Sequence, residues 1–389
     1  MRALPKERRK PLSMKNCAGS SPKSFPPSTS APQIMKLSHV LLRRAMKAYT
    51  YLEKGRFAMT EKSRPVILSP RDAVVKVTLA SICTSDLHIK NGAVPRAVPG
   101  IAVGHEFVGI VEETGSAVTN IIRGDRVAVN VETYCGECFF CRNGWVNNCT
   151  DRSGGWALGC RIDGGQAQFA RIPFADTNLI PIPAHVSDEQ ALFTGDLLST
   201  GYWSAKIADI REGDTVLILG AGPTGYCAAL CALLYKPARL IVCEKIPSRR
   251  AFIQAHFPSA EVVSSEELLP LLQKTEHGGA DTVIEAAGSE ESFRLAWQGA
   301  RPNAVVVIVA MYESAQTLPL PDMYGKNLTF KTGGVDGCDC DKVMRLIADG
   351  KLDATPLITH TFPFSEIDAA YALFEQKKDG VMKVAVRIS

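Results

Sequence analysis

The chain has 389 residues, more than the ~100 to 200 residues of a typical domain, so we expect two domains with separate cores. Hydrophobic residues make up 46% of it and charged residues 22%, as in globular proteins, and no apolar run approaches the ~18 residues that a membrane-spanning helix needs. The net charge of +4 is uneven, because residues 1–45 carry +9 and residues 46–389 therefore carry −5. This acidic main part argues against a nucleic-acid-binding protein, which would present a basic face.

Residues 1–45 are rich in Lys, Arg, Ser and Pro and too polar to form a core, so we expect a disordered extension. Their basic, acid-poor composition also fits an organelle transit peptide, and a start codon placed too early is another explanation. We expect the folded part to begin near Met46. The chain lacks the roughly 7–15-residue apolar core of a secretory signal, which favours a cytoplasmic, reducing setting for its twelve cysteines.

Residues 46–197 are expected to form an all-β, barrel-like domain. Their short β-branched runs are separated by Gly, Pro and Asp, which is typical of such domains. The clearest runs are 73–77, 107–111 and 126–129. A substrate pocket would be lined from scattered positions such as Val131, Trp145 and Trp156.

Two motifs of this domain offer metal ligands: C-T-S-D-L-H contains Cys83, and G-H-E contains His105. A third ligand is available in T-G-D-L-L-S-T-G, where Asp196 supplies a carboxylate. These three donors and a water would make a four-coordinate zinc with one open position, which is the arrangement of a catalytic site. Two alternatives remain open, because Asp196 could instead cap the helix that follows it and Glu106 could replace it as ligand.

Four cysteines form a second candidate metal site, with the spacing C-x2-C-x2-C-x7-C. This spacing lets one loop surround a tetrahedral zinc with four thiolates, which leaves no position for a substrate. The predicted role is therefore structural, since metal ligation can replace the core that a polar loop lacks. Disulfides are the weaker explanation in a reducing setting. The cluster consists of Cys135, Cys138, Cys141 and Cys149.

Residues 198–333 show a different rhythm, in which continuous apolar runs alternate with helical segments, as in a parallel sheet. The predicted strands are 215–219, 240–243, 281–284 and 304–309. The first of them leads into G-A-G-P-T-G, which contains Gly220, Gly222 and Gly225. Glycines at this spacing between a strand and a helix permit a tight turn and the close approach of a dinucleotide pyrophosphate.

Glu244 follows the second of these strands and is expected to accept hydrogen bonds from the adenosine ribose. A carboxylate there would repel the 2′-phosphate of NADP, so NAD is the preferred cofactor. Lys245, Arg249 and Arg250 lie nearby and would soften this discrimination. The remaining residues predict a helix at 341–349, a strand at 358–362, a helix at 366–376 and a strand at 383–388.

These motifs together resemble the zinc-containing medium-chain alcohol dehydrogenases over nearly all of residues 46–389. In that family the Cys of C-x-S-D-x-H, the His of G-H-E and an acidic or Cys residue before S-T-G bind the catalytic zinc. The resemblance implies an α/β fold with a GroES-like, β-barrel-type catalytic domain (46–197, completed by 334–389) and a doubly wound Rossmann domain (198–333). An Asp at the third ligand position implies a secondary-alcohol dehydrogenase or carbonyl reductase.

The resemblance also implies roles for residues that the motifs alone leave open. Asp86 would orient the imidazole of His105, Ser85 and His88 would form a proton relay, and Glu106 would be a secondary zinc ligand. Without the resemblance, Asp86 would be taken as a solvated charge and His88 as an ordinary surface residue. In the cofactor site, Arg249 would lie near the adenosine, Thr200 near the nicotinamide and Lys383 near the pyrophosphate.

The predicted function is reversible hydride transfer between a primary or secondary alcohol and NAD in a homodimer or homotetramer with two zinc ions per chain. A polyol, sugar or amino-alcohol dehydrogenase on the same scaffold is the alternative, which the Asp196 ligand mildly disfavours. A third hypothesis is a binding module with a vestigial enzyme fold, and the acidic body speaks against it. A stretch covering 305–309 and 318–323 is a candidate subunit interface.

Overall fold

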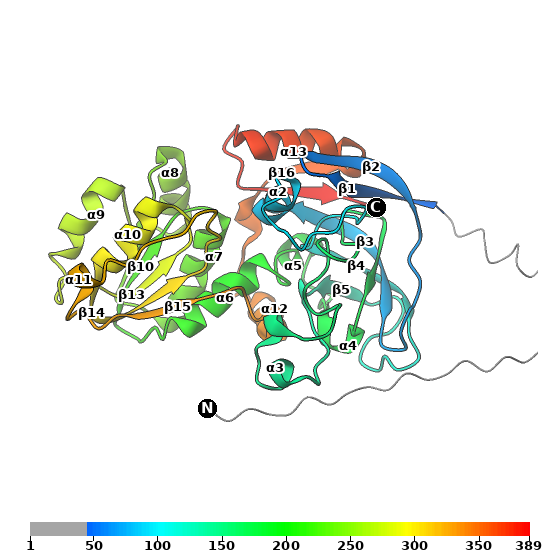
Figure 1. The fold of residues 1–389 in the computed structure, drawn as a ribbon, viewed down its shortest axis with the longest axis horizontal. Coiled ribbons are helices and arrows are strands. Elements are labelled where there is room, and N and C mark those ends of the chain that lie inside the picture. Colours follow the sequence, from blue (N-terminus) through cyan, green and yellow to red (C-terminus); the bar gives the residue numbers. More distant parts are fainter. Residues whose placement is uncertain (1–44) are drawn as a thin grey trace, which may run out of the picture. The chain divides into compact units, whose positions relative to one another are not determined.

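The computed structural model describes residues 45–389, which belong to one compact unit (Figure 1). The expected disordered extension therefore lies outside the described residues, except for its last residue. No described helix has both the length and the apolar character needed to cross a membrane. The first strands, β1 (Ala45–Glu53) and β2 (Arg56–Ser63), form an antiparallel hairpin, in agreement with a folded part that begins near Met46.

A seven-stranded sheet forms the core of the first domain, in the order β16-β17-β3-β4-β5-β9, with β8 paired to β3. Strand β17 lies antiparallel to β3, so the end of the chain completes the sheet that its beginning starts. The strands are β3 (Ala73–Ile82), β4 (Phe107–Thr114), β5 (Arg126–Val129), β8 (Phe169–Ile172), β9 (Leu179–Pro181), β16 (Ile358–Pro363) and β17 (Lys383–Arg387).

Short elements carry the loops of this domain. Strands β6 (Glu132–Thr133) and β7 (Gly155–Trp156) pair antiparallel at the two ends of the four-cysteine loop. The helices are α2 (Thr84–Lys90), α3 (Phe139–Arg142), α4 (Ala175–Asn178), α5 (Asp188–Ala191), α12 (Cys340–Ala348) and α13 (Ile367–Gln376). The 3-10 turns of the described chain are η1 (Val146–Asn148), η2 (Leu233–Tyr235), η3 (Gly337–Asp339), η4 (Thr355–Leu357) and η5 (Phe364–Glu366).

The second sheet has six strands, all parallel, in the order β12-β11-β10-β13-β14-β15 (Figure 1). The strands are β10 (Thr215–Leu219), β11 (Arg239–Cys243), β12 (Glu261–Val263), β13 (Ala280–Glu285), β14 (Ala300–Ile308) and β15 (Thr329–Thr332). The helices are α6 (Leu197–Ile207), α7 (Pro223–Ala232), α8 (Pro247–His256), α9 (Ser265–Leu272), α10 (Glu290–Gly299) and α11 (Leu320–Met323).

Helices cover both faces of this parallel sheet, which explains why its strands are apolar at consecutive positions. In β10, Val216 packs in a cluster with residues of α6 and α7, whereas Leu217 packs in another with residues of α9 and α10. The predicted α/β fold, a doubly wound Rossmann sheet with a GroES-like domain, is confirmed. The two outermost strands, β12 and β15, were not predicted, because they are short and only partly buried.

Candidate active site

A pocket of about 800 Å³ gathers most of the predicted site residues from segments far apart in the sequence. The predicted residues that line it are Cys83, Ser85, His88, His105, Asp196, Thr200, Gly220, Gly222, Glu244, Arg249 and Lys383. Two of the others, Asp86 and Glu106, lie just behind the lining and are almost completely buried. The ligand motifs and the glycine-rich loop thus open into the same space.

Three of these residues form a group with the composition of a catalytic zinc site. The donor atoms of Cys83, His105 and Asp196 all lie within 4.8 Å of one another. Cys83 lies at the N-terminus of α2 and Asp196 at that of α6, so helix starts position both side chains. The distance between Nε2 of His105 and Oδ2 of Asp196 is 3.3 Å. A thiolate, an imidazole and a carboxylate this close together suit zinc.

The alternative that Asp196 serves to cap the following helix is wrong, because its side chain does not make the capping hydrogen bond within residues 45–389. Asp196 does occupy the N-cap position of α6. A capping Asp normally accepts a backbone N–H from the first helical turn. The carboxylate points instead toward His105, where a metal ligand would be needed.

A buried chain of polar contacts fixes the imidazole of His105. Oδ1 of Asp86 lies 3.0 Å from Nδ1 of His105, and Oδ2 accepts the backbone N–H of Cys83 at 3.0 Å. Nε2 of Gln166 also donates to Oδ2 of Asp86, at 3.3 Å, and the hydroxyl of Tyr371 donates to Oε1 of Gln166 at 2.8 Å. Burial by itself lowers the pKa of His105, but the charge of Asp86 and hydrogen bonds with Asp196, Asp86 and Cys83 together outweigh burial and raise the pKa well above its ordinary value.

Gln166 and Tyr371 were missed by the sequence analysis, because neither belongs to a local motif. One indirect signal was present in G-H-E, since Gly104 has φ +88° and a Cβ atom there would lie 2.5 Å from Cγ of Gln166. Gly104 is therefore required both by its left-handed backbone and by the close approach of Gln166.

Glu106 is held by a buried ion pair rather than by the group of three donors. Its Oε2 lies 2.5 Å from Nζ of Lys383 and also accepts the hydroxyl of Ser81. Burial raises the pKa of Glu106, an effect that the ammonium of Lys383 opposes. Glu106 does not belong to the set of donors within 4.8 Å of one another, so its role as a secondary ligand stays a prediction.

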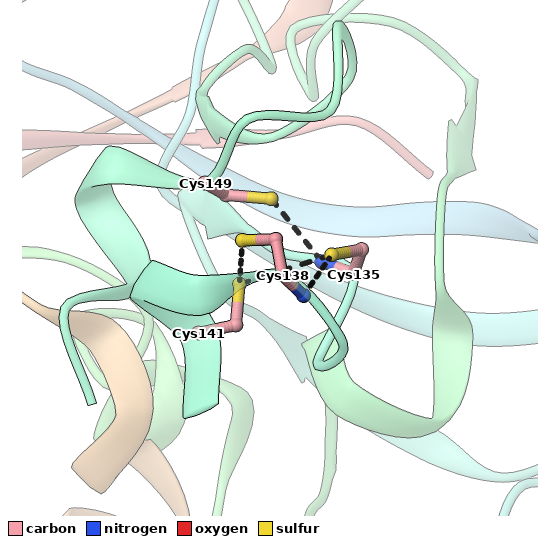
Figure 2. Close-up of side chains that lie close together, drawn as sticks. All are labelled: Cys135, Cys138, Cys141 and Cys149. Atoms are coloured by element: carbon pink, nitrogen blue, oxygen red, sulfur yellow. Dashed lines mark hydrogen bonds between the residues drawn. The ribbon is translucent and has the colours of Figure 1, made fainter. Parts of the chain in front are cut away.

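The four-cysteine loop brings its sulfur atoms together as its spacing predicts (Figure 2). All four lie within 4.8 Å of one another, with Sγ of Cys138 3.4 Å from Sγ of Cys141. This is far longer than the ~2.05 Å of a disulfide bond, and all the cysteines of the described residues are free. Backbone N–H groups of Thr150 and Cys141 lower the pKa of Cys138 to about 6, which favours the thiolate that zinc binds.

The glycines of the glycine-rich loop are not all required for the same reason. Gly220 has φ +97°, and a Cβ atom on Gly225 would lie 1.8 Å from the carbonyl oxygen of Gly220, so both are required by the turn itself. Gly222, by contrast, has φ −72°, and a Cβ atom there would meet only Nη1 of Arg249, at 3.8 Å. Among residues 45–389, no atom requires a glycine at this position, which is where a ligand would approach.

Glu244 connects the second strand of the sheet to this loop. Its Oε2 accepts the backbone N–H of Ala221 at 2.8 Å, and its Oε1 accepts that of Ile246 at 2.9 Å. Each carboxylate oxygen can accept a further hydrogen bond, so ribose hydroxyls could still bind. Arg250 donates to the carbonyl oxygens of Glu244 and Lys245, which draws its guanidinium to the backbone.

Comparisons with known proteins agree with these donor sets. Residues 69–184 match the alcohol dehydrogenase GroES-like domain. An alcohol dehydrogenase of Cupriavidus necator is 33% identical over 369 residues, covering 88% of this chain and 98% of that protein. The chain belongs to the zinc-type medium-chain alcohol dehydrogenase family.

Two further relatives carry different nicotinamide cofactors in their names, NADP in one and NADH in the other. The NADP-dependent isopropanol dehydrogenase of Thermoanaerobacter brockii is 29% identical, over 88% of this chain and 99% of that protein. The structure of alcohol dehydrogenase TADH from Thermus sp. ATN1 has a TM-score of 0.81 and 33% identity, with 88% and 100% of the two chains covered. An E. coli CFT073 alcohol dehydrogenase complexed with NADH has a TM-score of 0.80 and 27% identity, with 88% and 99% covered.

The predicted enzyme class is thereby confirmed: the protein is a zinc-dependent oxidoreductase that acts on CH–OH groups. Its pocket corrects one prediction about lining residues. Val131 and Trp156 line the pocket, but Trp145 does not. Trp145 is 47% exposed and packs against Phe139 in the four-cysteine loop, where its ring supports the loop rather than the substrate site.

Proposed function

We propose that this alcohol dehydrogenase transfers a hydride reversibly between the carbinol carbon of a primary or secondary alcohol and the nicotinamide of NAD, giving an aldehyde or a ketone. One observation carries the proposal: the pocket lined by Cys83, His105 and Asp196 also contains the glycine-rich loop at Gly220 and Gly222. A metal-ligand group and a dinucleotide loop in one space would place alcohol and cofactor side by side.

The residues present fit a catalytic zinc. Both ring nitrogens of His105 are buried and, in the described part of the chain, lack a well-formed hydrogen bond. Nδ1 lies beside Asp86, whereas Nε2 lies beside Asp196, which makes Nε2 the ligand atom. Zinc bound by Cys83, His105 and Asp196 would act as a Lewis acid on the substrate oxygen. Asp86 would keep the His105 ring oriented, as partners of metal-bound imidazoles do. Glu106 would become a secondary ligand only by leaving Lys383.

The proton of the substrate hydroxyl must leave the pocket before or with the hydride. Oγ of Ser85 lies 3.7 Å from Sγ of Cys83, beside the metal ligands, so this hydroxyl is the first acceptor in the proposed relay. His88 also lines the pocket, and its Nδ1 lies 3.5 Å from Oε1 of Glu313. An imidazole there can pass the proton to solvent, because one ring nitrogen can accept a proton while the other donates one.

NAD is the cofactor that Glu244 favours, because its carboxylate suits ribose hydroxyls and repels a 2′-phosphate. Lys245 and Arg249 line the same pocket and would reduce this preference without abolishing it. We place Arg249 near the adenosine and Thr200 near the nicotinamide. Lys383 would reach the pyrophosphate only by leaving its buried contacts with Glu106 and the carbonyl oxygen of Ile82.

Initial rates of NADH formation with a panel of alcohols, before and after zinc removal by a chelator, test the proposal. We expect turnover of at least one primary or secondary alcohol, its loss with the chelator, and a kcat/KM for NAD above that for NADP. Glu244→Ser should shift the cofactor ratio toward NADP, since it removes the charge that repels the phosphate. Absence of turnover with every alcohol, polyol and carbonyl would overturn the proposal.

A further inference from the structure

Two buried polar side chains of the pocket have no part in the chemistry described so far. Glu132 in β6 and Trp156 in β7 are cross-strand partners in an antiparallel pair, so their side chains lie on the same face. They are only 5% and 9% exposed, and both line the pocket together with Cys83, His105 and Asp196. The pair is therefore part of the wall next to the metal-ligand group.

Each of the two side chains carries a polar atom without a partner. Within residues 45–389, Oε2 of Glu132 and Nε1 of Trp156 are both buried and make no hydrogen bond. Leaving a buried polar group unpaired costs roughly 1–3 kcal/mol, and native proteins rarely tolerate it without a reason. An unpaired acceptor opposite an unpaired donor indicates a ligand group that completes both.

The location of the pair limits what this ligand is. The ring of Trp156 lies 5.5 Å from the imidazole of His105, measured between centroids, which places it at the metal end of the pocket. The adenosine end is lined instead by Glu244 and Arg249. A group that reaches Glu132 and Trp156 therefore belongs to the alcohol rather than to the dinucleotide.

The chemistry of the pair selects a hydroxyl group. A hydroxyl donates one hydrogen bond and accepts others, so it can satisfy the carboxylate of Glu132 and the N–H of Trp156 at once. An ammonium group has no acceptor for the indole N–H, and a methyl group satisfies neither atom. Burial and the charge of Asp196 raise the pKa of Glu132 well above its ordinary value, which weakens its attraction for a cation further. The guanidinium of Arg96, which lies over the ring of Trp156 at 5.2 Å from its centroid, only partly opposes this rise.

We propose that this dehydrogenase prefers alcohols with a second hydroxyl group near the reacting carbinol, and that Glu132 and Trp156 bind this second hydroxyl as specificity-determining residues. The inference rests on the proposed function of the pocket and names its substrate class as vicinal diols and short polyols. From the sequence, Asp196 as the third zinc ligand mildly disfavoured a polyol dehydrogenase. The buried pair of Glu132 and Trp156 bears on the substrate more directly, because both residues line the pocket.

The four-cysteine loop holds this pair in place. Cys135 follows β6 closely and Cys149 precedes β7, so a zinc bound by the loop ties both strands together. The turn into β7 is tight as well, because Gly155 has φ +66° and a Cβ atom there would lie 2.7 Å from the carbonyl oxygen of Asn147. A rigid hairpin is suited to a specificity site, since loose groups discriminate poorly.

Two substrates that differ in a single hydroxyl, 2,3-butanediol and 2-butanol, test the inference in the zinc-loaded enzyme. We expect kcat/KM for the diol to exceed that for 2-butanol by at least about 10-fold, because a site built for a hydroxyl discriminates strongly against analogues that lack it. Glu132→Leu and Trp156→Phe should each reduce this ratio about 10-fold or more, mainly through KM of the diol. Glu132→Gln should restore part of it, because an amide oxygen still accepts a hydrogen bond.

Glu113→Gln is the matched control, since Glu113 is an exposed carboxylate in β4, and it should leave the ratio unchanged. Equal kcat/KM for the two alcohols in the wild type, or an unchanged ratio in Glu132→Leu and Trp156→Phe, would overturn the inference and leave the proposed function intact. A preference for 3-amino-2-butanol over the diol would also overturn it. Failure to oxidise any of these alcohols would count against the proposed function instead.

Discussion

Nε2 of His105 lies 3.3 Å from Oδ2 of Asp196, although His105 belongs to the β-sheet domain and Asp196 to the start of α6. The contact brings an imidazole and a carboxylate, both common zinc ligands, together at the wall of a pocket that the glycine-rich loop also lines. A capping role does not explain Asp196, because its side chain makes no capping hydrogen bond within the described residues. The pair is explained by a shared metal ion.

Asp196→Ala should remove the catalytic zinc while leaving the four-cysteine loop metal-loaded. Two protein ligands hold zinc far less firmly than three, so we expect about one zinc per chain in place of two and an activity at least about 100-fold lower. Metal analysis of the purified protein and kcat with an alcohol check this. Asp349→Ala, which removes an exposed carboxylate, is the control. Retention of two zinc ions and full activity would contradict the role of Asp196.

Gln166→Leu should weaken the site without touching a ligand. Its amide connects Tyr371 to Asp86, which in turn orients His105. Loss of such a supporting group typically costs about 10–100-fold in metal affinity or activity. Zinc affinity, measured by competition with a chelator, should fall together with kcat, whereas Gln376→Leu at the exposed end of α13 should change neither. An unchanged zinc affinity would argue that the chain only packs the core.

The spacing of metal ligands and the alternation of apolar strands with helices were the features of the sequence that predicted the most of the fold and the site. The four-cysteine loop and the turn at Gly220 are local in sequence, so their geometry follows from spacing alone. Fold class and family followed from the same motifs. Strands β12 and β15 escaped prediction because they are edge strands of three and four residues with partly exposed side chains, too short for a periodic signal.

Residues that act through tertiary contacts could not be predicted in this way. Gln166 reaches Asp86 only because β8 and the loop before it pack beside β3, and Glu132 meets Trp156 only when β6 pairs with β7. Trp145 was expected among the scattered positions that line the pocket, but it lies in the four-cysteine loop and is 47% exposed. The proposed homodimer or homotetramer stays a prediction, as does the cytoplasmic setting.

Two glycines of the dinucleotide loop should respond to alanine in opposite ways. Gly222→Ala should fold normally, since its φ of −72° suits alanine and the added methyl meets only the tip of Arg249. If the pyrophosphate passes here, the methyl group should raise KM for NAD about 10-fold or more. Gly225→Ala should instead lower the unfolding temperature, because its Cβ would lie 1.8 Å from a carbonyl oxygen. A normal KM for NAD in Gly222→Ala would place the pyrophosphate elsewhere.

Cys149→Ser should abolish the structural zinc and destabilise the fold. The loop that it closes has little core of its own, so the binding free energy of zinc contributes directly to folding. We expect about one zinc per chain and a thermal midpoint lower by several degrees in calorimetry. Asp349→Ala serves as the control, because Asp349 is exposed and lies outside the four-cysteine loop. A variant with full zinc content and an unchanged midpoint would show that the four cysteines are incidental.

Asp176 should contribute to stability in a way that depends on pH. Its carboxylate accepts the backbone N–H groups of Thr119 at 3.0 Å and Asn120 at 2.9 Å, and the hydroxyl of Thr119 at 2.9 Å. Burial raises the pKa of Asp176, but these hydrogen bonds to the charged form outweigh it and lower the pKa below its ordinary value. A depressed folded pKa means that the ionised carboxylate stabilises the native state above the unfolded pKa of ~3.9. That contribution is lost as pH falls through the lower, folded value.

Asp176→Asn therefore should cost on the order of 1 kcal/mol of unfolding free energy at neutral pH, because it removes charge-assisted hydrogen bonds from the loop at Thr119. The difference from the wild type should shrink as pH falls below the unfolded pKa of ~3.9 and through the lower, folded pKa, because the wild-type carboxyl then also becomes neutral. Urea unfolding of the holoenzyme at a series of pH values measures both effects, with the exposed Asp349→Asn as the control. A cost that stays constant from neutral pH to about pH 3 would show that shape, and not charge, holds this loop.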